Sequence, residues 1–327
     1  MNTILVTGGA GFIGSSLADN LLLAGNKVVI VDNFNDFYSP HIKENNIEEI
    51  KKNMKKNNIE DNKLVLYRAD IRDKEEMNDI FNSTKIDIIV HLAAMAGVRP
   101  SISNPELYYD VNINGTLNLL EQCKKHNIKK FIFASSSSVY GENEKVPFSE
   151  SDIVDNPISP YASTKKSGEL LCYTYHHLYN INIACLRFFT VYGPRQRPDL
   201  AIHKFTKLIM EGKEIPFFGD GSTQRDYTYI DDIIDGVVKS IQWIDIEEKR
   251  YDIFNLGESQ TISLNQMVET IENIIGKKAI KNILPMQPGD VTRTNADINK
   301  SKLILNYNPK TSFDEGINKF VNWLKNN

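Results

Sequence analysis

The stretch Thr3-Ile-Leu-Val-Thr-Gly-Gly-Ala-Gly-Phe-Ile-Gly14 stands near the start of the chain. Its apolar residues 4–6 predict a buried parallel strand, and residues 12–23 have the spacing of an amphipathic helix. Glycine is needed where a backbone turns tightly, approaches a pyrophosphate and lets a helix pack on a strand. The glycines between the two elements are Gly8, Gly11 and Gly14. The stretch therefore predicts a phosphate-binding turn at a helix N-terminus.

A second apolar run, residues 27–31, ends in Asp32 and predicts the next parallel strand. A carboxylate here can accept hydrogen bonds from both hydroxyls of an adenosine ribose, and it disfavours a 2′-phosphate. A glycine triplet alone is a weak signal, but strand, glycines, helix, strand and acid in this order are a strong one. The pattern therefore predicts that the chain binds NAD. The contacts expected from this region are Gly8, Gly11, Phe12, Ile13, Gly14, Asp32 and Asn33.

The composition is ordinary for a soluble globular protein, with 41% hydrophobic and 24% charged residues among 327. The net charge of −4 gives no indication of a nucleic-acid partner. The three cysteines are widely spaced in segments predicted to be helix or strand, so we expect buried thiols rather than disulfides or zinc ligands. The six histidines show no metal-binding spacing, and no metal site is predicted.

Targeting and membrane segments are not evident. The glycine-rich stretch begins within ten residues of Met1, which leaves no room for a signal peptide. No apolar run approaches the ~20 residues that a membrane-spanning helix needs. We therefore expect a cytoplasmic protein that binds neither nucleic acid nor membrane.

Strands and helices alternate over the first part of the chain, which predicts an α/β fold of the Rossmann type with a doubly wound parallel sheet. The polar insertion 33–62 carries apolar residues at helical spacing, and it predicts a surface helix that turns Ile42, Ile47, Ile50 and Met54 inward. Later strands are expected over residues 63–68, 86–91, 129–134 and 181–188, and helices over residues 73–81, 105–126 and 160–179. Asp73 is placed to cap the first of these helices.

Ligands of such a sheet bind outside the carboxyl ends of its strands. Several residues directly after predicted strands, or at the end of one, are therefore expected to contact the cofactor, the first two at the adenine. They are Asp70, Ile71, Leu92, Ala93, Ala94 and Phe188.

The alternation loosens from about Thr190, where short elements are separated by glycine and proline. We expect an NAD-binding domain over residues 1–189 and a smaller, discontinuous α/β lobe, mainly within 190–327, that covers a second substrate. Part of the later chain is expected to return to the first domain.

Ser136 and the segment Tyr161-Ala-Ser-Thr-Lys165 form the candidate catalytic group. Four residues apart on a helix, Tyr161 and Lys165 share one face, so the ammonium can lie near the phenol. A free tyrosine has a pKa near 10, and a nearby positive charge lowers that pKa toward neutrality. Ser136, at the end of a neighbouring strand, can hydrogen-bond the same substrate hydroxyl. We expect Tyr161 to be a general base.

Four motifs together resemble the extended short-chain dehydrogenase/reductase superfamily over essentially the whole chain. They are the glycine stretch 7–14, His91-Leu-Ala-Ala94, Ser135 to Gly141 (SSSSVYG) and Tyr161 with Lys165. Within this superfamily the chain resembles nucleotide-sugar 4-epimerases. The resemblance implies a tightly held NAD that is reduced and reoxidised in each turnover. It implies that Tyr161 takes the 4-hydroxyl proton, that the 4-keto sugar turns over, and that hydride returns to its opposite face.

Ser137 and Ser138 bear on the substrate chemistry. Similar 4,6-dehydratases carry an Asp-Glu pair directly after the catalytic Ser or Thr, and UDP-glucuronate decarboxylases carry a Glu two places after it. The serines supply no acid for chemistry at C5. Elimination and decarboxylation are therefore disfavoured.

Residues 186–199 resemble UDP-glucuronic acid 4-epimerases, and the resemblance places Thr190 and Arg197 near the sugar carboxylate. Residues 32–38 and 96–99, which include Arg99, are similar to the same subgroup. Arginine suits a forked carboxylate contact. Arg195 or Arg197 could instead bind the diphosphate or lie on the surface.

Other activities stay open at this point. One is the same epimerisation of neutral UDP-glucose or UDP-N-acetylglucosamine, and a less favoured one is a UDP-sugar dehydratase or decarboxylase. A non-catalytic NAD-binding regulator and a net oxidoreductase are further alternatives.

The resemblance also implies contacts to UDP. Arg225 suits the diphosphate and Asp290 the uridine ribose, with Ser136, Ser137 and Ser138 also expected near the substrate. Gln287 stands where UDP-galactose 4-epimerases often carry an arginine, a change for which Arg293 could compensate. Asn112 resembles a position that steadies the active-site backbone, although an ordinary surface asparagine fits the sequence equally well.

The helices predicted over residues 105–126 and 160–179 correspond to those that pair in a four-helix dimer interface of relatives. The resemblance therefore implies a homodimer.

Overall fold

A computed structural model describes residues 1–246, 249–286 and 291–326. Its main element is a seven-stranded sheet in which every neighbouring pair is parallel. The strand order β11-β6-β5-β4-β1-β2-β3 reverses at β1, as in a doubly wound fold. The strands are β1 (Thr3–Thr7), β2 (Lys27–Asp32), β3 (Leu64–Arg68), β4 (Ile88–His91), β5 (Lys130–Ser136), β6 (Asn182–Phe188) and β11 (Tyr251–Leu256). The predicted fold class is confirmed.

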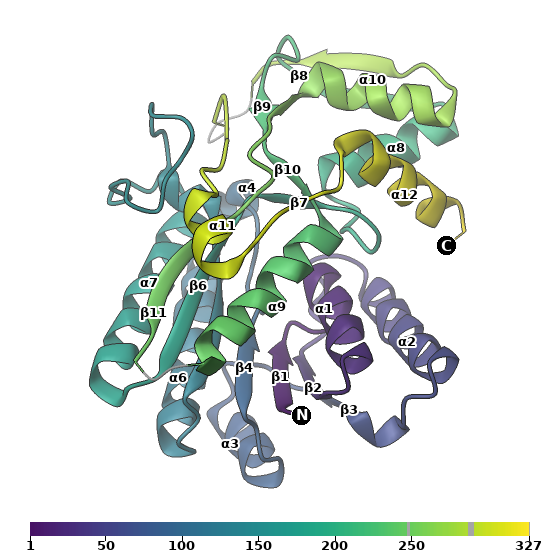
Figure 1. Cartoon of the computed structure of the whole chain (residues 1–327). Helices are drawn as coiled ribbons and strands as arrows, with labels where there is room; N and C mark the ends of the chain where they lie inside the picture. Colours follow the sequence, from purple (N-terminus) through teal and green to yellow (C-terminus); the bar gives the residue numbers. More distant parts are fainter. Residues whose placement is uncertain (247–248, 287–290, 327) are drawn as a thin grey trace.

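Helices cover both faces of this sheet (Figure 1). On one face lie α1 (Phe12–Leu23), α2 (Pro40–Lys56) and α9 (Ile230–Ile246), and on the other α3 (Lys74–Ser83), α6 (Gly115–Lys125) and α7 (Pro160–Tyr179). Along β1, Ile4 and Val6 pack into one core, whereas Leu5 between them packs into the other. Because both faces are buried, β1 is a continuous apolar run and not an alternating one.

The sequence predicts the bounds of several helices closely, and α1 and α7 begin and end at the expected residues. Asp73 caps α3 as expected, because its carboxylate accepts hydrogen bonds from the N–H groups of Glu75 and Glu76. In α2, Ile47 and Ile50 are buried, which confirms the inserted surface helix.

The prediction of a single helix over residues 105–126 is wrong for the middle of that range. The structure has α5 (Pro105–Tyr109), then a π-helical segment (Asp110–Asn114), then α6. A short helix, α4 (Val98–Ser103), precedes them. π-Helical turns inside longer helices are often found at functional sites. Here the π-helical segment contains the buried Asn112, whose contacts are described below.

The later chain divides between the main sheet and a smaller lobe. β11 adds the edge strand beside β6, and α9 covers one face of the sheet. In Figure 1 the helices α8, α10 and α12 gather with β8 beyond the carboxyl ends of the strands. The lobe contains β7 (Thr190–Tyr192), α8 (Ala201–Glu211), β8 (Glu214–Phe218), β9 (Gln224–Arg225), β10 (Tyr227–Tyr229), β12 (Ile262–Ser263), α10 (Leu264–Ile275), β13 (Ile280–Leu284) and α12 (Phe313–Lys325), while α11 (Asn299–Leu305) packs on β11. The domain boundary at residues 189 and 190 stays a prediction.

All three cysteines are buried and free, as expected. Among the described residues, no group of side chains could hold a metal ion. No helix in the described ranges is long and apolar enough to cross a bilayer.

Candidate active site

One pocket runs along the carboxyl ends of the central strands and continues under the smaller lobe. Most residues singled out from the sequence line it, although they come from distant parts of the chain. The pocket contains Gly8, Gly11, Phe12, Ile13, Gly14, Asp32, Asn33, Asp70, Ile71, Leu92, Ala93, Ala94, Ser136, Ser137, Ser138, Tyr161, Lys165, Phe188, Thr190, Arg197 and Arg225. The topology therefore brings the predicted cofactor-binding, catalytic and substrate-binding residues into one site.

Arg99 is an exception, because it is not among the residues that line this pocket. Its guanidinium lies over the ring of Phe218 in the smaller lobe, 5.1 Å from the ring centroid. The expected contact of Arg99 with the substrate is therefore not supported. Asp290 and Gln287 lie outside the described residues.

The glycine turn packs tightly against the neighbouring strand ends. Gly8 has a φ of +68°, and a Cβ there would lie 2.9 Å from backbone atoms of Ala93. A Cβ on Gly14 would lie 2.2 Å from the carbonyl oxygen of Gly8. Gly11, at the N-cap of α1, has no side chain to cover the free N–H groups of the first turn. The turn thus has the close approach and the exposed helix N-terminus that a dinucleotide pyrophosphate requires.

Asp32 is buried at the end of β2 and is fixed by backbone donors. Its carboxylate accepts hydrogen bonds from the N–H groups of Ala10 at 3.1 Å and Phe34 at 2.8 Å. The ammonium of Lys43 lies 3.7 Å from one of its oxygens. An ionised carboxylate has about four acceptor sites, so Asp32 keeps capacity for ribose hydroxyls. Lys43, on the inserted α2, is a pocket residue that no local sequence pattern indicated.

Asp70 lines the same pocket and is held in an ion pair with Arg72. Arg72 donates to both of its carboxylate oxygens, and Asn33 donates to one of them at 2.9 Å. Hydrogen bonding by Arg72 lowers the pKa of Asp70 to about 2. Asp70 is therefore a fixed anion in the expected adenine region. The residues present fit an NAD molecule.

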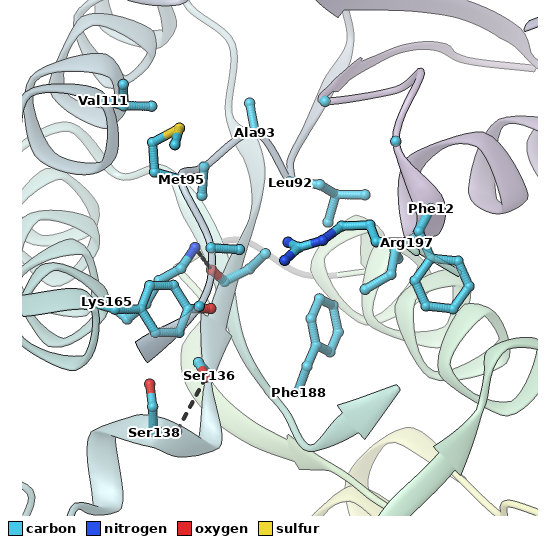
Figure 2. A pocket seen from close by; sticks show the side chains of 18 of the residues that line it. Phe12, Leu92, Ala93, Met95, Val111, Ser136, Ser138, Lys165, Phe188 and Arg197 are labelled. Atoms are coloured by element: carbon cyan, nitrogen blue, oxygen red, sulfur yellow. Dashed lines mark hydrogen bonds between the residues drawn. The ribbon is translucent and has the colours of Figure 1, made fainter. Parts of the chain in front are cut away.

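Tyr161 and Lys165 line the pocket from the first turns of α7, where Ser159 caps the helix. Figure 2 shows Lys165 at the pocket wall. The Lys165 ammonium donates to the carbonyl of Ala134 at 2.7 Å, and burial lowers its pKa to about 8. It lies 5.8 Å from the centroid of the Tyr161 ring. Lys165 is thus anchored on β5 beside the phenol ring.

The balance of effects on the Tyr161 phenol differs from the expected one. Burial is the largest effect and raises the pKa of Tyr161. A hydrogen bond with Ser136 and the positive charge of Arg197 lower it in part. Lys165 is not among these effects in the protein alone, so the expectation that it lowers this pKa stays a prediction.

The serines follow β5, where a 3-10 turn (Ser137–Tyr140) begins. The Ser136 hydroxyl accepts a hydrogen bond from the N–H of Ser138 at 3.1 Å, drawn in Figure 2. The Ser138 hydroxyl is buried and has no partner among the described residues. A buried hydroxyl without a partner is costly, so Ser138 is well suited to bind a ligand in the pocket.

Asn112 is buried and ties three segments together. Its side chain accepts from the N–H of Met95 at 2.8 Å and donates to the carbonyl of Met95 at 3.0 Å. It also donates to the Thr164 hydroxyl, next to Lys165, at 3.0 Å. These contacts match the backbone-steadying role that the resemblance implied and exclude the alternative of a surface asparagine.

A buried polar network links β5, the strand that ends at Ser136, to its neighbours β6 and α7. Arg187 and Glu169 are each 1% exposed and form a forked ion pair, with Nε–Oε1 at 2.8 Å and Nη2–Oε2 at 2.9 Å. The Ser135 hydroxyl donates to Glu169 at 2.7 Å, and Arg187 also donates to the Tyr140 hydroxyl. The network fixes β5 and β6 to α7, the helix that carries Tyr161.

Thr190 and Arg197 lie where the main sheet meets the smaller lobe. The N–H of Thr190 donates to the carbonyl of Asp226. Figure 2 shows the Arg197 guanidinium reaching into the pocket between Leu92 and Phe188. Arg195 is instead buried and forms ion pairs with the partly exposed Asp19 and Glu49, so it neither lies on the surface nor lines the pocket.

Arg225 lines the pocket, and its guanidinium donates to the carbonyl of Gln224 at 2.9 Å. Arg293 is exposed, and its backbone forms a bridge with Gln224. Arg225 and Arg293 therefore both lie at β9, but of the two only Arg225 lines the pocket.

Comparison with known proteins agrees with this geometry. The family model described as GDP-mannose 4,6 dehydratase matches residues 5–320. The whole chain is 46% identical to a UDP-glucuronate 4-epimerase of Thermodesulfobacterium geofontis, of which 97% is covered.

Two solved structures are similar over 99% of both chains. One is the UDP-glucuronic acid 4-epimerase of Bacillus cereus in complex with UDP-glucuronic acid and NAD, with a TM-score of 0.89 and 38% identity. The other is the UDP-glucose 4-epimerase of Thermotoga maritima with UDP-glucose, with a TM-score of 0.87 and 34% identity. The chain therefore belongs to the extended short-chain dehydrogenase/reductase family and, within it, to the UDP-sugar 4-epimerases that use NAD.

Proposed function

We propose that the protein interconverts UDP-glucuronic acid and UDP-galacturonic acid. The observation that carries the proposal is a positive side chain, Arg197, in the same pocket as Tyr161 and near enough to lower the pKa of its phenol. Thr190 lines this pocket as well, and serines occupy positions 137 and 138 where related lyases carry acids. Two of the relatives above are named for UDP-glucuronate.

The side chains divide the chemical work as follows. Ionised Tyr161 accepts the proton of the sugar 4-hydroxyl, while Ser136 orients that hydroxyl through a hydrogen bond. Lys165, held by Ala134, supplies positive charge beside the phenolate. When bound, NAD supplies a nicotinamide that accepts a hydride from C4 and later returns it. After the 4-keto sugar has turned, Tyr161 gives the proton back to the oxygen at C4.

The cofactor would be held by the glycine turn at the diphosphate, by Asp32 at the ribose and by the region of Asp70 at the adenine. Arg225 would meet the UDP diphosphate, and Ser137 and Ser138 the sugar. Asp290, proposed for the uridine ribose, lies outside the described residues.

A comparison of substrates tests the proposal. With UDP-glucuronic acid in place, a carboxylate satisfies the remaining N–H groups of Arg197, whereas a neutral sugar leaves them in the pocket without that partner. We expect kcat/KM for UDP-glucose and UDP-N-acetylglucosamine to be lower by at least ~100-fold. Faster epimerisation of either neutral sugar would contradict the carboxylate assignment. Absence of all turnover with normal NAD binding would favour a regulator, and stoichiometric consumption of free NAD an oxidoreductase.

Thr190 is expected to limit loss of CO2. Oxidised at C4, a glucuronate is a β-keto acid, and it decarboxylates when the breaking bond aligns with the carbonyl π system. A neutral hydroxyl can orient the carboxylate away from that alignment. We expect Thr190→Ala to raise the share of pentose product several-fold, measured by NMR, while Thr190→Ser keeps the wild-type share. An unchanged share in Thr190→Ala would contradict this role.

We also propose that the protein is a cytoplasmic homodimer. The segments 105–126 and 160–179, which the resemblance places in a dimer interface, both expose apolar side chains. They are Tyr109 and Leu117 on the first segment and Leu170, Tyr173 and Leu178 on the second. Pairing would remove these side chains from water. We expect a mass in solution near twice 37.2 kDa by light scattering. A monomeric mass at micromolar concentration would contradict the dimer.

A further inference from the structure

Arg197 is held by a second residue of its own loop, Asp199. The guanidinium Nε lies 3.0 Å from Oδ1 and Nη2 lies 2.6 Å from Oδ2, so the contact is a side-on fork. A backbone hydrogen bond from Leu200 N–H to the Arg197 carbonyl closes the turn that brings the two side chains together. Asp199 directly precedes the N-terminal region of α8, where a negative charge is favourable.

The two members of this pair differ in exposure. The Arg197 side chain is 16% exposed. Its guanidinium carbon lies 5.0 Å from the centroid of the Phe37 ring, which also lines the pocket. The Asp199 side chain is 42% exposed and is not among the residues that line the pocket. Asp199 therefore reaches Arg197 from the solvent side, whereas the guanidinium points into the site (Figure 2).

The fork determines which edge of Arg197 faces a ligand. A guanidinium has five N–H groups in a rigid plane, and the side-on fork uses one on Nε and one on Nη2. Of the three others, one on Nη1 and one on Nη2 lie side by side along the end of the group. This end matches a second carboxylate, so one arginine can bind Asp199 and an acidic ligand at the same time.

We propose that Asp199 is a positioning residue that fixes the end-on edge of Arg197 toward the acidic group of the sugar. Asp199 thereby sets the preference for acidic over neutral UDP-sugars, and the inference rests on the proposed function. Without the fork, the long Arg197 side chain is free to take other rotamers, and binding an acidic sugar must order it again.

A double-mutant cycle tests this proposal, with the ratio of kcat/KM for UDP-glucuronic acid to kcat/KM for UDP-glucose as the readout. In Asp199→Asn the amide N–H2 opposes one guanidinium nitrogen, so the fork is lost at almost constant volume. We expect the ratio to fall at least ~10-fold. In an Arg197→Met background, the same Asp199→Asn change should alter the ratio less than about twofold.

Controls separate positioning from general damage. Glu211→Gln, at the far end of α8 and paired with Lys213 on the surface, should leave the ratio unchanged. NAD content of Asp199→Asn should equal that of the wild type, and its melting temperature should fall by no more than about 4 °C, as expected for a charge lost near the start of α8. A rise in the ratio, an equal loss on both sugars, or the same effect in the Arg197→Met background would overturn the proposal. A wild-type enzyme that prefers UDP-glucose would instead refute the proposed function, whatever the variants do.

Discussion

The Tyr161→Phe variant is expected to lose about 1,000-fold in kcat, within the range measured for removal of a general acid-base group. Phenylalanine keeps the ring and removes only the oxygen that takes the 4-hydroxyl proton. Bound NAD and thermal stability should therefore stay at the wild-type level. Single-turnover and steady-state assays with UDP-glucuronic acid measure the loss.

Tyr108→Phe is the matched control for this variant. The Tyr108 ring lies edge-on to Tyr161, with centroids 6.3 Å apart, and its hydroxyl donates to the carbonyl of Ala96 at 2.9 Å. We expect this variant to keep at least a tenth of the activity, because its hydroxyl has a structural partner. If Tyr161→Phe retained as much activity as Tyr108→Phe, Tyr161 would not be the base.

The second large effect is expected on stability, in Glu169→Ala. The change leaves the Arg187 charge buried at 1% exposure without its forked partner. Removing one member of a buried ion pair typically costs ~3–5 kcal/mol in the free energy of unfolding. Ser135, which donates to Glu169, also loses its acceptor. Urea unfolding followed by circular dichroism measures the change.

A double variant distinguishes a buried unpaired charge from simple loss of packing. Glu169→Leu combined with Arg187→Met replaces the pair by apolar side chains, and it should be more stable than Glu169→Ala alone. Glu48→Ala, which removes an exposed pair with Lys51, should not shift the unfolding midpoint. A double variant as unstable as the single one would show that the ion pair itself is not the source of the effect.

Local patterns were enough to predict the elements that carry the site. Apolar periodicity and capping residues act within a few residues, so the bounds of α1 and α7 follow from the sequence. The break in the helix over residues 105–126 does not, because the hydrogen bonds of Asn112 to Met95 and Thr164 form between segments distant in sequence.

The partners of charged residues were the hardest feature to predict. Arg195 and Arg197 are close in sequence, yet Arg195 pairs with Asp19 and Glu49 while Arg197 reaches the pocket. The anchoring of Lys165 on Ala134 likewise depends on the packing of α7 against β5. Residue type and spacing predict which side chains can act in catalysis, whereas tertiary packing determines which contact each one makes.

The central claim is that C4 is oxidised and then reduced by the same hydride within one closed site. The most direct test uses UDP-glucuronic acid with deuterium at C4, incubated with the purified enzyme and analysed by NMR and mass spectrometry. We expect UDP-galacturonic acid that keeps its deuterium at C4 and forms without loss of free NAD. Deuterium released to solvent, or a pentose as the main product, would contradict it.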